Sequence, residues 1–588
     1  MLSGRKGHVN PDCSESGSAN PVGVAFEARR YTRPMSRRTA LVLLAVFGAG
    51  VFLAGLELMI TAVALPAIVA DLADWTQLRK ASWIIQAYLL VYIIVMPLAG
   101  RVSDLWGARR LFLGALTVFI VGSVLAGRAQ TLDELIVARI VQAVGGGVLV
   151  PVATAAASHL FEGHARPRAL GVVGALTFLG MAAGPFLGAS ILDAVHVDVA
   201  LSRAGISGGP LVDALDPAWR WVFYVNVPIG IVALVLGWAA SHGWDTPRRR
   251  GRVDIPGGAV FTVALLAGLV GVSLLGIGSS GDLGVDPALL IGGLLAIAVV
   301  ATVVTIVIGL RTDDPYVDPR LFRSAVFSSA TLVSLLTGYA FATAIIGGAV
   351  FVNRVLYGGP DLERQALGSL AGATAIGALA SGFAVRVLSL RLVTLVGLAA
   401  SGLALVGMSR WGPETPIAEV ALLLAVFGLG FGMTVTPHST AAVEAVGRRA
   451  FGVASATVTV ARMIGMAVGL AVLTAYGSTT IERLFDRVYA TPESYKQFIP
   501  VELRDRPLRD GLVVEALENW AAGEGSRIMV GIFLVAAGLT VVAVPPALVM
   551  GRRARMLPQA EGPATVTGPA VARMEPDGPD EVEPTLAL

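Results

Sequence analysis

Three charged residues interrupt long apolar runs of this sequence. Glu57 lies within LAGLELMI, Arg139 within LIVARIVQ and Arg462 within VTVARMIG. At a rise of about 1.5 Å per residue, each lies well inside a helix that could cross a membrane, where a charge must face a partner or a polar cavity. A carboxylate close to an arginine that can release it is the chemistry of a protonation switch. A permanent structural ion pair is the alternative interpretation.

A short charged segment, GRVSDLWGARR at 100–110, joins two of the apolar runs. Its aspartate, its glycine turn and its two arginines can hydrogen-bond to the ends of neighbouring helices. Such contacts can be made and broken as two halves of a protein rock against each other. We therefore predict a conformational latch, formed by Gly100, Asp104, Gly107, Arg109 and Arg110.

Small residues mark a third candidate region, with Gly180, Gly184 and Gly188 spaced four residues apart and Pro185 beside them. Small residues on one helix face allow a close crossing with another helix. The proline removes a backbone donor and permits a kink. By themselves these residues predict only tight helix packing.

The elements that must position these residues are helices in a membrane. Hydrophobic residues make up 55% of the 588 residues and charged residues only 14%, which is typical of a polytopic membrane protein. About fourteen apolar runs of about 20 residues are present, each long enough to span a bilayer. The fold class expected is therefore all-α.

The loops between these runs differ in charge. Because the number of spans is even, both termini are expected on one side, and the basic residues fall on alternate loops on that side. They are Arg37, Arg38, Arg109, Arg110, Arg166, Arg168, Arg248 to Arg250, Arg252, Arg320, Arg323, Arg386, Arg391, Arg448, Arg449, Arg552, Arg553 and Arg555. The positive-inside rule makes that side cytoplasmic, so we expect a multi-pass protein of the cell membrane with both termini in the cytoplasm.

Polar segments flank and interrupt the spans. Residues 1–38 lack the short apolar core of a secretory signal, and residues 551–588 are rich in Pro, Glu and Asp; both are expected to be disordered cytoplasmic tails. A long external segment is expected at 478–526, with helical spacing of apolar residues at 512–520. It either extends the last two spans outward as a hairpin or is a solvated loop carrying a surface helix.

Several classes of function are disfavoured by composition. The single cysteine, Cys13, excludes an intrachain disulfide and a cysteine-based metal site. The three lysines, Lys6, Lys80 and Lys496, provide no Walker A loop, and a net charge of +3 does not favour nucleic acid. His159 and His438 are interpreted as interfacial residues at cytoplasmic helix ends rather than ligands. No metal, cofactor or catalytic constellation is expected, so an enzyme is disfavoured.

Taken together, the motifs resemble those of the major facilitator superfamily, in particular its fourteen-span drug:proton antiporter group. The resemblance runs from about residue 39 to 550. Residues 100–110 are similar to the superfamily's loop motif between spans two and three, and Glu57 with VALP at 63–66 is similar to the first-span acid motif. The motifs similar to those of the fourth, fifth and sixth spans contain Arg139, Gln142 and Gly145; Gly180, Gly184, Pro185 and Gly188; and WRWVFYVNVPIG at 219–230.

A narrower likeness points to a branch of mycobacterial exporters linked to drugs and to lipids such as triacylglycerides. It rests on ASWII at 81–85, on 452–463 and on the long external segment. That branch carries a carboxylate on the fifth span just before the glycine equivalent to Gly180, where this chain has Phe178 and Leu179. A central acid to partner Arg462 must then come from elsewhere.

The resemblance implies a major facilitator fold with two six-span bundles, at 39–241 and 325–550, and a linker at 242–324 that carries two inserted helices. It implies proton-coupled export of small amphipathic or apolar compounds, with membrane lipids and a lipoprotein of the periplasm or cell envelope as further partners. Export of triacylglyceride-like lipids is the alternative, and a non-transporting membrane receptor is a remote one.

Overall fold

The computed structural model describes residues 36–72, 81, 83–163, 165–195, 215–242, 244–246, 248, 253–276, 286–446, 451–488, 491, 493–507 and 509–550. Every regular element in these ranges is helical, and fourteen helices are long and apolar enough to cross a membrane. The predicted all-α fold with about fourteen spans is confirmed. Almost all of both tails, most of residues 193–218 between the fifth and sixth spans, and the arginines at 249, 250, 252, 448 and 449 lie outside the described residues.

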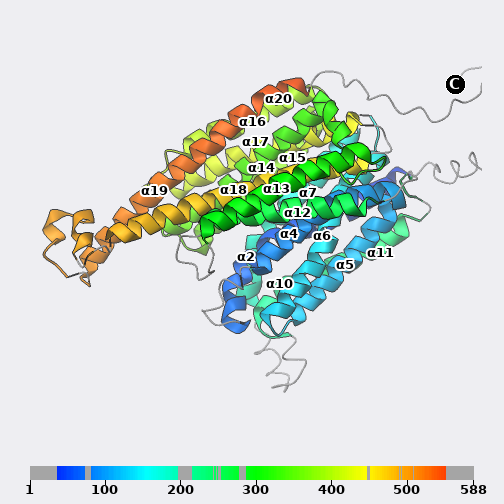
Figure 1. The fold of residues 1–588 in the computed structure, drawn as a ribbon. Helices are drawn as coiled ribbons and strands as arrows, with labels where there is room; N and C mark the ends of the chain where they lie inside the picture. Colours follow the sequence, from blue (N-terminus) through cyan, green and yellow to red (C-terminus); the bar gives the residue numbers. More distant parts are fainter. Residues whose placement is uncertain are drawn as a thin grey trace, which may run out of the picture.

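The first six spans pack mainly against one another. They are α2 (Arg37–Leu72), α4 (Trp83–Trp106), α5 (Ala108–Arg128), α6 (Leu132–Leu160), α7 (Ala165–Ala194) and a broken sixth span made of α10 (Trp221–Tyr224) and α11 (Asn226–Ala240). The largest contacts join α2 to α7, α5 to α6 and α4 to α6. Figure 1 shows this group in blue and cyan.

The last six spans form a second group. They are α14 (Ala325–Val350), α15 (Pro360–Ala384), α16 (Leu390–Met408), α17 (Ile417–Glu444), α18 (Phe451–Val488) and α19 (Gly511–Val542) with its continuation α20 (Val544–Val549). The two groups meet where α7 packs on α15 and α4 packs on α18. We propose two bundles, at 39–241 and 325–550, on the basis of this packing.

Two further helices, α12 (Ile255–Ser273) and α13 (Pro287–Arg311), pack against each other, and α12 also packs on α4 and α18. The segment after α13 fastens this pair to α4. The Tyr316 hydroxyl donates to the Ile94 carbonyl oxygen over 3.2 Å, and Arg101 of α4 forms an ion pair with Asp314. Burial raises the pKa of Tyr316, so its hydroxyl keeps the proton that it donates.

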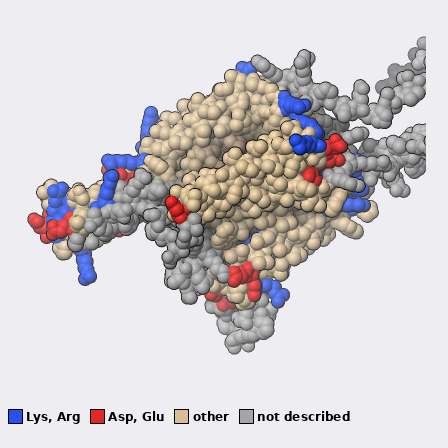
Figure 2. Space-filling model, in the orientation of Figure 1, with Lys and Arg blue, Asp and Glu red and all other residues tan. Residues whose placement is uncertain are grey.

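The outer surface of the bundle matches a lipid environment. Only a small part of α13 is buried, and it exposes Leu289, Val299 and Val300. Figure 2 shows a broad surface without charged residues between two charged ends. We call one of them the basic end; it holds the starts of α5, α7 and α14, beside which lie Arg109, Arg110, Arg166, Arg320 and Arg323.

At the opposite end, α18 and α19 continue beyond the rest of the bundle as a hairpin (Figure 1). The 38 residues of α18 correspond to about 57 Å of helix, against about 30 Å for the hydrocarbon core of a bilayer. The tip has its own small core, in which Phe498 packs on Trp520 with ring centroids 4.6 Å apart. The hairpin alternative for 478–526 is therefore the one observed.

Glycines let α2 and α7 approach until their backbones touch. A Cβ atom at Gly55 would collide with the Thr177 carbonyl oxygen, and one at Gly180 would collide with the Phe52 carbonyl oxygen. In a bilayer the hydrophobic effect does not drive helices together, so close van der Waals packing is a main source of helix association.

We expect Gly180→Ala to destabilise the protein by about 1–3 kcal/mol, because the added methyl group forces α2 and α7 apart. Thermal unfolding of the purified protein in detergent checks this. Gly372→Ala on α15, where a Cβ would meet nothing within 4 Å, is the matched control and should leave the unfolding midpoint unchanged or slightly raised. Equal midpoints for the two variants would contradict the packing argument.

Candidate functional site

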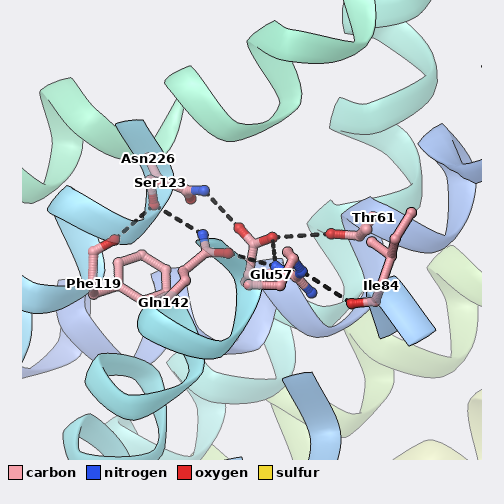
Figure 3. Close-up of polar contacts among 8 residues, drawn as sticks. Glu57, Thr61, Ile84, Phe119, Ser123, Gln142 and Asn226 are labelled. Atoms are coloured by element: carbon pink, nitrogen blue, oxygen red, sulfur yellow. Dashed lines mark hydrogen bonds and ion pairs between the residues drawn. The ribbon is translucent and has the colours of Figure 1, made fainter. Parts of the chain in front are cut away.

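Glu57 lies on α2 and is fully buried. Its Oε1 accepts a hydrogen bond from the Thr61 hydroxyl over 2.9 Å, and its Oε2 accepts one from the Asn226 side-chain amide over 2.6 Å. Arg139 of α6 completes the set with an ion pair to Oε1. Figure 3 shows the carboxylate enclosed by these partners. The charge is thus held by side chains of α2, α6 and α11.

Arg139 is bound on several sides. Besides Glu57, it donates to Gln142 Oε1 over 2.6 Å and to the Ile84 carbonyl oxygen over 3.3 Å. Its guanidinium carbon lies 4.0 Å from the centroid of the Tyr88 ring, a cation–π contact. The structure therefore brings together two of the three charged residues predicted from the sequence.

A second layer orients this pair. The Gln142 amide donates to the Ser123 hydroxyl over 2.9 Å, and that hydroxyl donates to the Phe119 carbonyl oxygen of α5 over 2.9 Å (Figure 3). Gly122 of α5 leaves room for this contact, because a Cβ there would meet the Gln142 backbone at 2.5 Å. A buried ion pair is stable only when its remaining hydrogen-bonding groups are satisfied, and this layer satisfies them.

One acceptor beside the carboxylate has no partner. Asn226 Oδ1 is buried without a hydrogen bond, whereas its amide nitrogen donates to Glu57. Rotation of the side-chain amide by half a turn would place Oδ1 against Glu57, where it could accept a hydrogen bond from the O–H of a neutral carboxylic acid. The site can therefore satisfy Glu57 in both its charged and its protonated form.

The latch segment contacts the second bundle through Asp104. This carboxylate, only 6% exposed, accepts hydrogen bonds from the backbone N–H groups of Gly452 over 3.0 Å and Val453 over 3.1 Å. Both groups lie in the first turn of α18, where unpaired N–H groups and the helix dipole attract an anion. Gly100 allows the approach, because a Cβ there would lie 2.6 Å from the Gly452 carbonyl oxygen.

The arginines of the latch bind elsewhere. Arg109 donates through Nε to Ser241 Oγ over 2.8 Å and through its backbone N–H to Asp245 Oδ1 over 3.0 Å, both within the first bundle and the start of the linker. Gly107 turns the chain at φ 92°, and Arg110 is exposed. Of the five latch residues, Asp104 and Gly100 therefore reach across to the other half, and the remaining three do not.

The glycines of the fifth span face α2. Besides Gly180, a Cβ at Gly184 would meet Met59 at 2.8 Å and one at Gly188 would meet Ile60 at 3.2 Å. Pro185 lies within the same helix. Met59 and Ile60 lie two and three residues after Glu57, so the packing of these glycines constrains the helix that carries the acid.

Arg462 lies apart from the Glu57 network. It is 7% exposed, and within the described residues its side chain makes no ion pair or hydrogen bond; its guanidinium carbon lies 6.0 Å from the Phe178 ring. The prediction that His438 is interfacial is wrong. α17 continues to Glu444, and His438 is only 1% exposed.

Sequence reasoning missed several partners of these residues. Thr61, one helical turn after Glu57, is the one with a clear signal, because residues four apart share a helix face. Ser123, Ser241, Asp245 and Asp314 carried no such signal, since their contacts depend on how separate helices pack. Among the described residues, no group of three or more His, Cys, Asp or Glu side chains could hold a metal ion.

Comparison with known proteins extends these findings. Residues 47–470 match the family model of the Major Facilitator Superfamily. A triacylglyceride transporter of Mycolicibacterium hassiacum is 32% identical, with 89% of this chain and 94% of the relative covered. Multidrug resistance protein 3 of Bacillus subtilis is 28% identical, with 72% and 77% covered. The human organic anion transporter MFSD10 has a TM-score of 0.55 at 13% identity, over 87% of this chain and 100% of that one, which shows a shared fold alone.

We expect Asp104→Asn to open the basic end, because a neutral amide loses about 1–2 kcal/mol of attraction to the N-terminus of α18. In a Cys13→Ser, Ser455→Cys background, the new thiol would lie at the contact between Ser455 and the Pro151 carbonyl oxygen. Maleimide labelling of this thiol from the basic end should be up to about tenfold faster with Asp104→Asn. Asp133→Asn, at the exposed start of α6, is the control, and equal labelling rates would refute the latch.

Proposed function

Because this chain belongs to the Major Facilitator Superfamily, and is thus a multi-pass membrane transporter and not an enzyme, we propose that it exports amphipathic or apolar compounds in exchange for protons. It would act in the cell membrane with its basic end and both termini in the cytoplasm, as its arginine distribution suggests.

The observation that carries this proposal is the Glu57 network. A carboxylate fully buried among apolar helices is expensive to maintain, and in a membrane such a residue commonly marks a proton relay. Glu57 has a nearby cation that stabilises its charged form and, in Asn226 Oδ1, an acceptor that can stabilise its protonated form. This pairing supports a site that alternates between the two states.

Proton binding would alter the first bundle in a defined way. Neutralising Glu57 removes the attraction that holds Arg139 against α2, so the guanidinium retains Gln142, Ile84 and the Tyr88 and Phe223 rings as partners. Alternating access in this type of fold arises from rocking of the bundles about a central site. We propose that protonation of Glu57 biases that rocking and that the Asp104 contact resists opening toward the cytoplasm.

The class of substrate rests on the relatives and on the hairpin. Similarity to multidrug transporters supports export of small amphipathic drugs. Similarity to triacylglyceride transporters, together with the hairpin, supports the alternative of lipid export. A long acyl chain that leaves the membrane exposes methylenes to water at about 0.8 kcal/mol each, so a lipid exporter benefits from structure beyond the bilayer, where an envelope lipoprotein could also bind.

The tip of the hairpin restricts how such shielding could work. Of the apolar residues at helical spacing in 512–520, Leu517 and Trp520 pack into the tip core with Phe498, whereas Leu512 is exposed. Shielding by the tip would therefore require it to open, or would use the exposed Leu512, Val514 and Val501.

We expect Glu57→Gln to abolish export driven by a pH gradient, because glutamine cannot take up or release a proton. Dye efflux from proteoliposomes with an imposed gradient measures this, and insertion and folding should be preserved, since glutamine keeps the size and the acceptor oxygen. Glu419→Gln, at an exposed site on α17, should transport normally. Gradient-dependent export by the Glu57 variant would remove the basis of proton coupling at this residue.

The drug and lipid alternatives differ in their dependence on the hairpin. Replacing 489–510 by a short linker leaves the base anchored by the hydrogen bonds from Tyr357 to Glu518 and from Ser526 to Trp411. We expect this variant to lose lipid export to a greater extent than dye export, as measured with labelled triacylglyceride and dye in the same proteoliposomes. Full transport of both by a folded variant would favour general drug efflux.

A further inference from the structure

The second buried cation, Arg462, has no counter-ion among the residues that the structure describes. Glu57 is a fully buried acid, but it already forms an ion pair with Arg139 and accepts hydrogen bonds from Thr61 and Asn226. The guanidinium of Arg462 instead lies near the face of Phe178. A charge in a low-dielectric interior is costly unless it is paired, so a buried arginine in this position requires a negative group from another source.

Two hydrogen-bonding side chains with unused capacity lie near Arg462. Arg462 lies within electrostatic range of Tyr92 on α4 and of His438 on α17. Both ring nitrogens of His438 and the hydroxyl groups of Tyr92 and Tyr88 are buried without a hydrogen-bond partner. More than nine in ten buried polar groups of proteins are bonded. The three unbonded atoms of His438 and Tyr92 near one unpaired cation therefore point to a ligand with several acceptor atoms.

An aromatic wall lies beside the cation. Phe178 of α7, Phe341 of α14 and Phe431 of α17 contact one another with centroid distances of 5.4, 5.2 and 4.4 Å. All three rings are buried, and they come from both bundles. A single cation next to a wall of aromatic rings matches an amphiphile with one anionic group and an apolar body.

We propose that Arg462, His438 and Tyr92 bind the oxyanion of an acidic amphiphile, and that this protein exports lipids or drugs bearing a carboxylate or phosphate. The planar guanidinium suits two-point binding of such a group, and the Tyr92 hydroxyl and a histidine N–H can donate to its remaining lone pairs. The inference deepens the proposed export function and rests on it, because it names the charge class of the substrate.

The site also adjoins the proton site. Tyr92 stacks on Tyr88 with centroids 5.7 Å apart, and Tyr88 lies under Arg139. Two aromatic rings thus separate the cation that holds Glu57 from the cation that holds the substrate anion. This proximity gives the bound anion a short path along which to influence the proton site.

Binding to the intact purified protein tests the inference without any proton gradient. Oleate, oleyl alcohol and oleylamine share one chain and differ in charge, so their affinities, measured by quenching of tryptophan fluorescence, isolate the contribution of the head group. We expect oleate to bind at least tenfold more tightly than the alcohol and the amine. An oleoyl lysophosphatidate arm shows whether phosphate is preferred to carboxylate. Equal affinities for the charged and neutral probes would overturn the proposal.

Variants of Arg462 test whether this residue causes the preference for oleate over oleyl alcohol. Arg462→Gln should remove the preference for oleate while leaving affinity for oleyl alcohol within about twofold, and Arg462→Lys should retain part of it because the charge remains. Arg311→Gln, at the exposed end of α13, is the matched control and should bind as wild type. If Arg462→Gln folds and still prefers oleate, the site is wrong.

A second variant keeps the test decisive if Arg462→Gln does not fold. Phe178→Glu places an acid where the ring now faces Arg462 and should supply an internal counter-ion that competes with the anionic ligand. We expect the oleate preference to fall to near unity; an unchanged preference would contradict the proposal. If the protein binds oleate preferentially but shows no proton-driven export, the proposed function is contradicted and this inference is not. If it shows proton-driven export but no preference for oleate, this inference is contradicted and the proposed function is not.

Discussion

A charge buried among membrane helices must find its partner within the protein, and that constraint organises the first bundle. Glu57 and Arg139 satisfy each other, but their remaining donors and acceptors recruit Thr61, Gln142 and Asn226. These residues come from α2, α6 and α11, and the carbonyl of Ile84 adds α4. The relative rotation of four helices is therefore tied to one carboxylate, so a change in its protonation is felt by all of them.

The number and order of the spans were predictable because each is a continuous apolar run, and the buried charges stood out against that background. Their partners were less predictable. Glu57 and Arg139 are 82 positions apart, and they meet because glycines at 55, 122 and 180 let backbones approach. Arg109 binds Ser241 and Asp245 rather than the other half, and His438 is buried because α17 extends past it. Contacts between helices that are distant in sequence depend on rotations that a single sequence does not encode locally.

The surroundings of the two buried arginines, Arg139 and Arg462, indicate different roles. Arg139 is saturated by side chains of its own bundle, whereas Arg462 lies among rings and unpaired polar atoms contributed by both bundles. A saturated pair can serve a reversible internal event such as proton uptake. An unsaturated cation at the junction of two bundles is suited to a ligand that enters and leaves between them.

The attachment of the inserted helices to α4 also limits how far the second bundle can move from α4, because a short segment connects the two. Tyr316 is hydrogen-bonded to Ile94, and α14 begins at Ala325, so the eight residues 317–324 connect this anchored residue to the second bundle. Fully extended, they span at most about 30 Å, and the short helix at Pro319–Arg323 shortens this further. The start of α14 therefore cannot travel farther than that contour length from α4 while the anchor holds, which limits how wide the two halves can separate on this side.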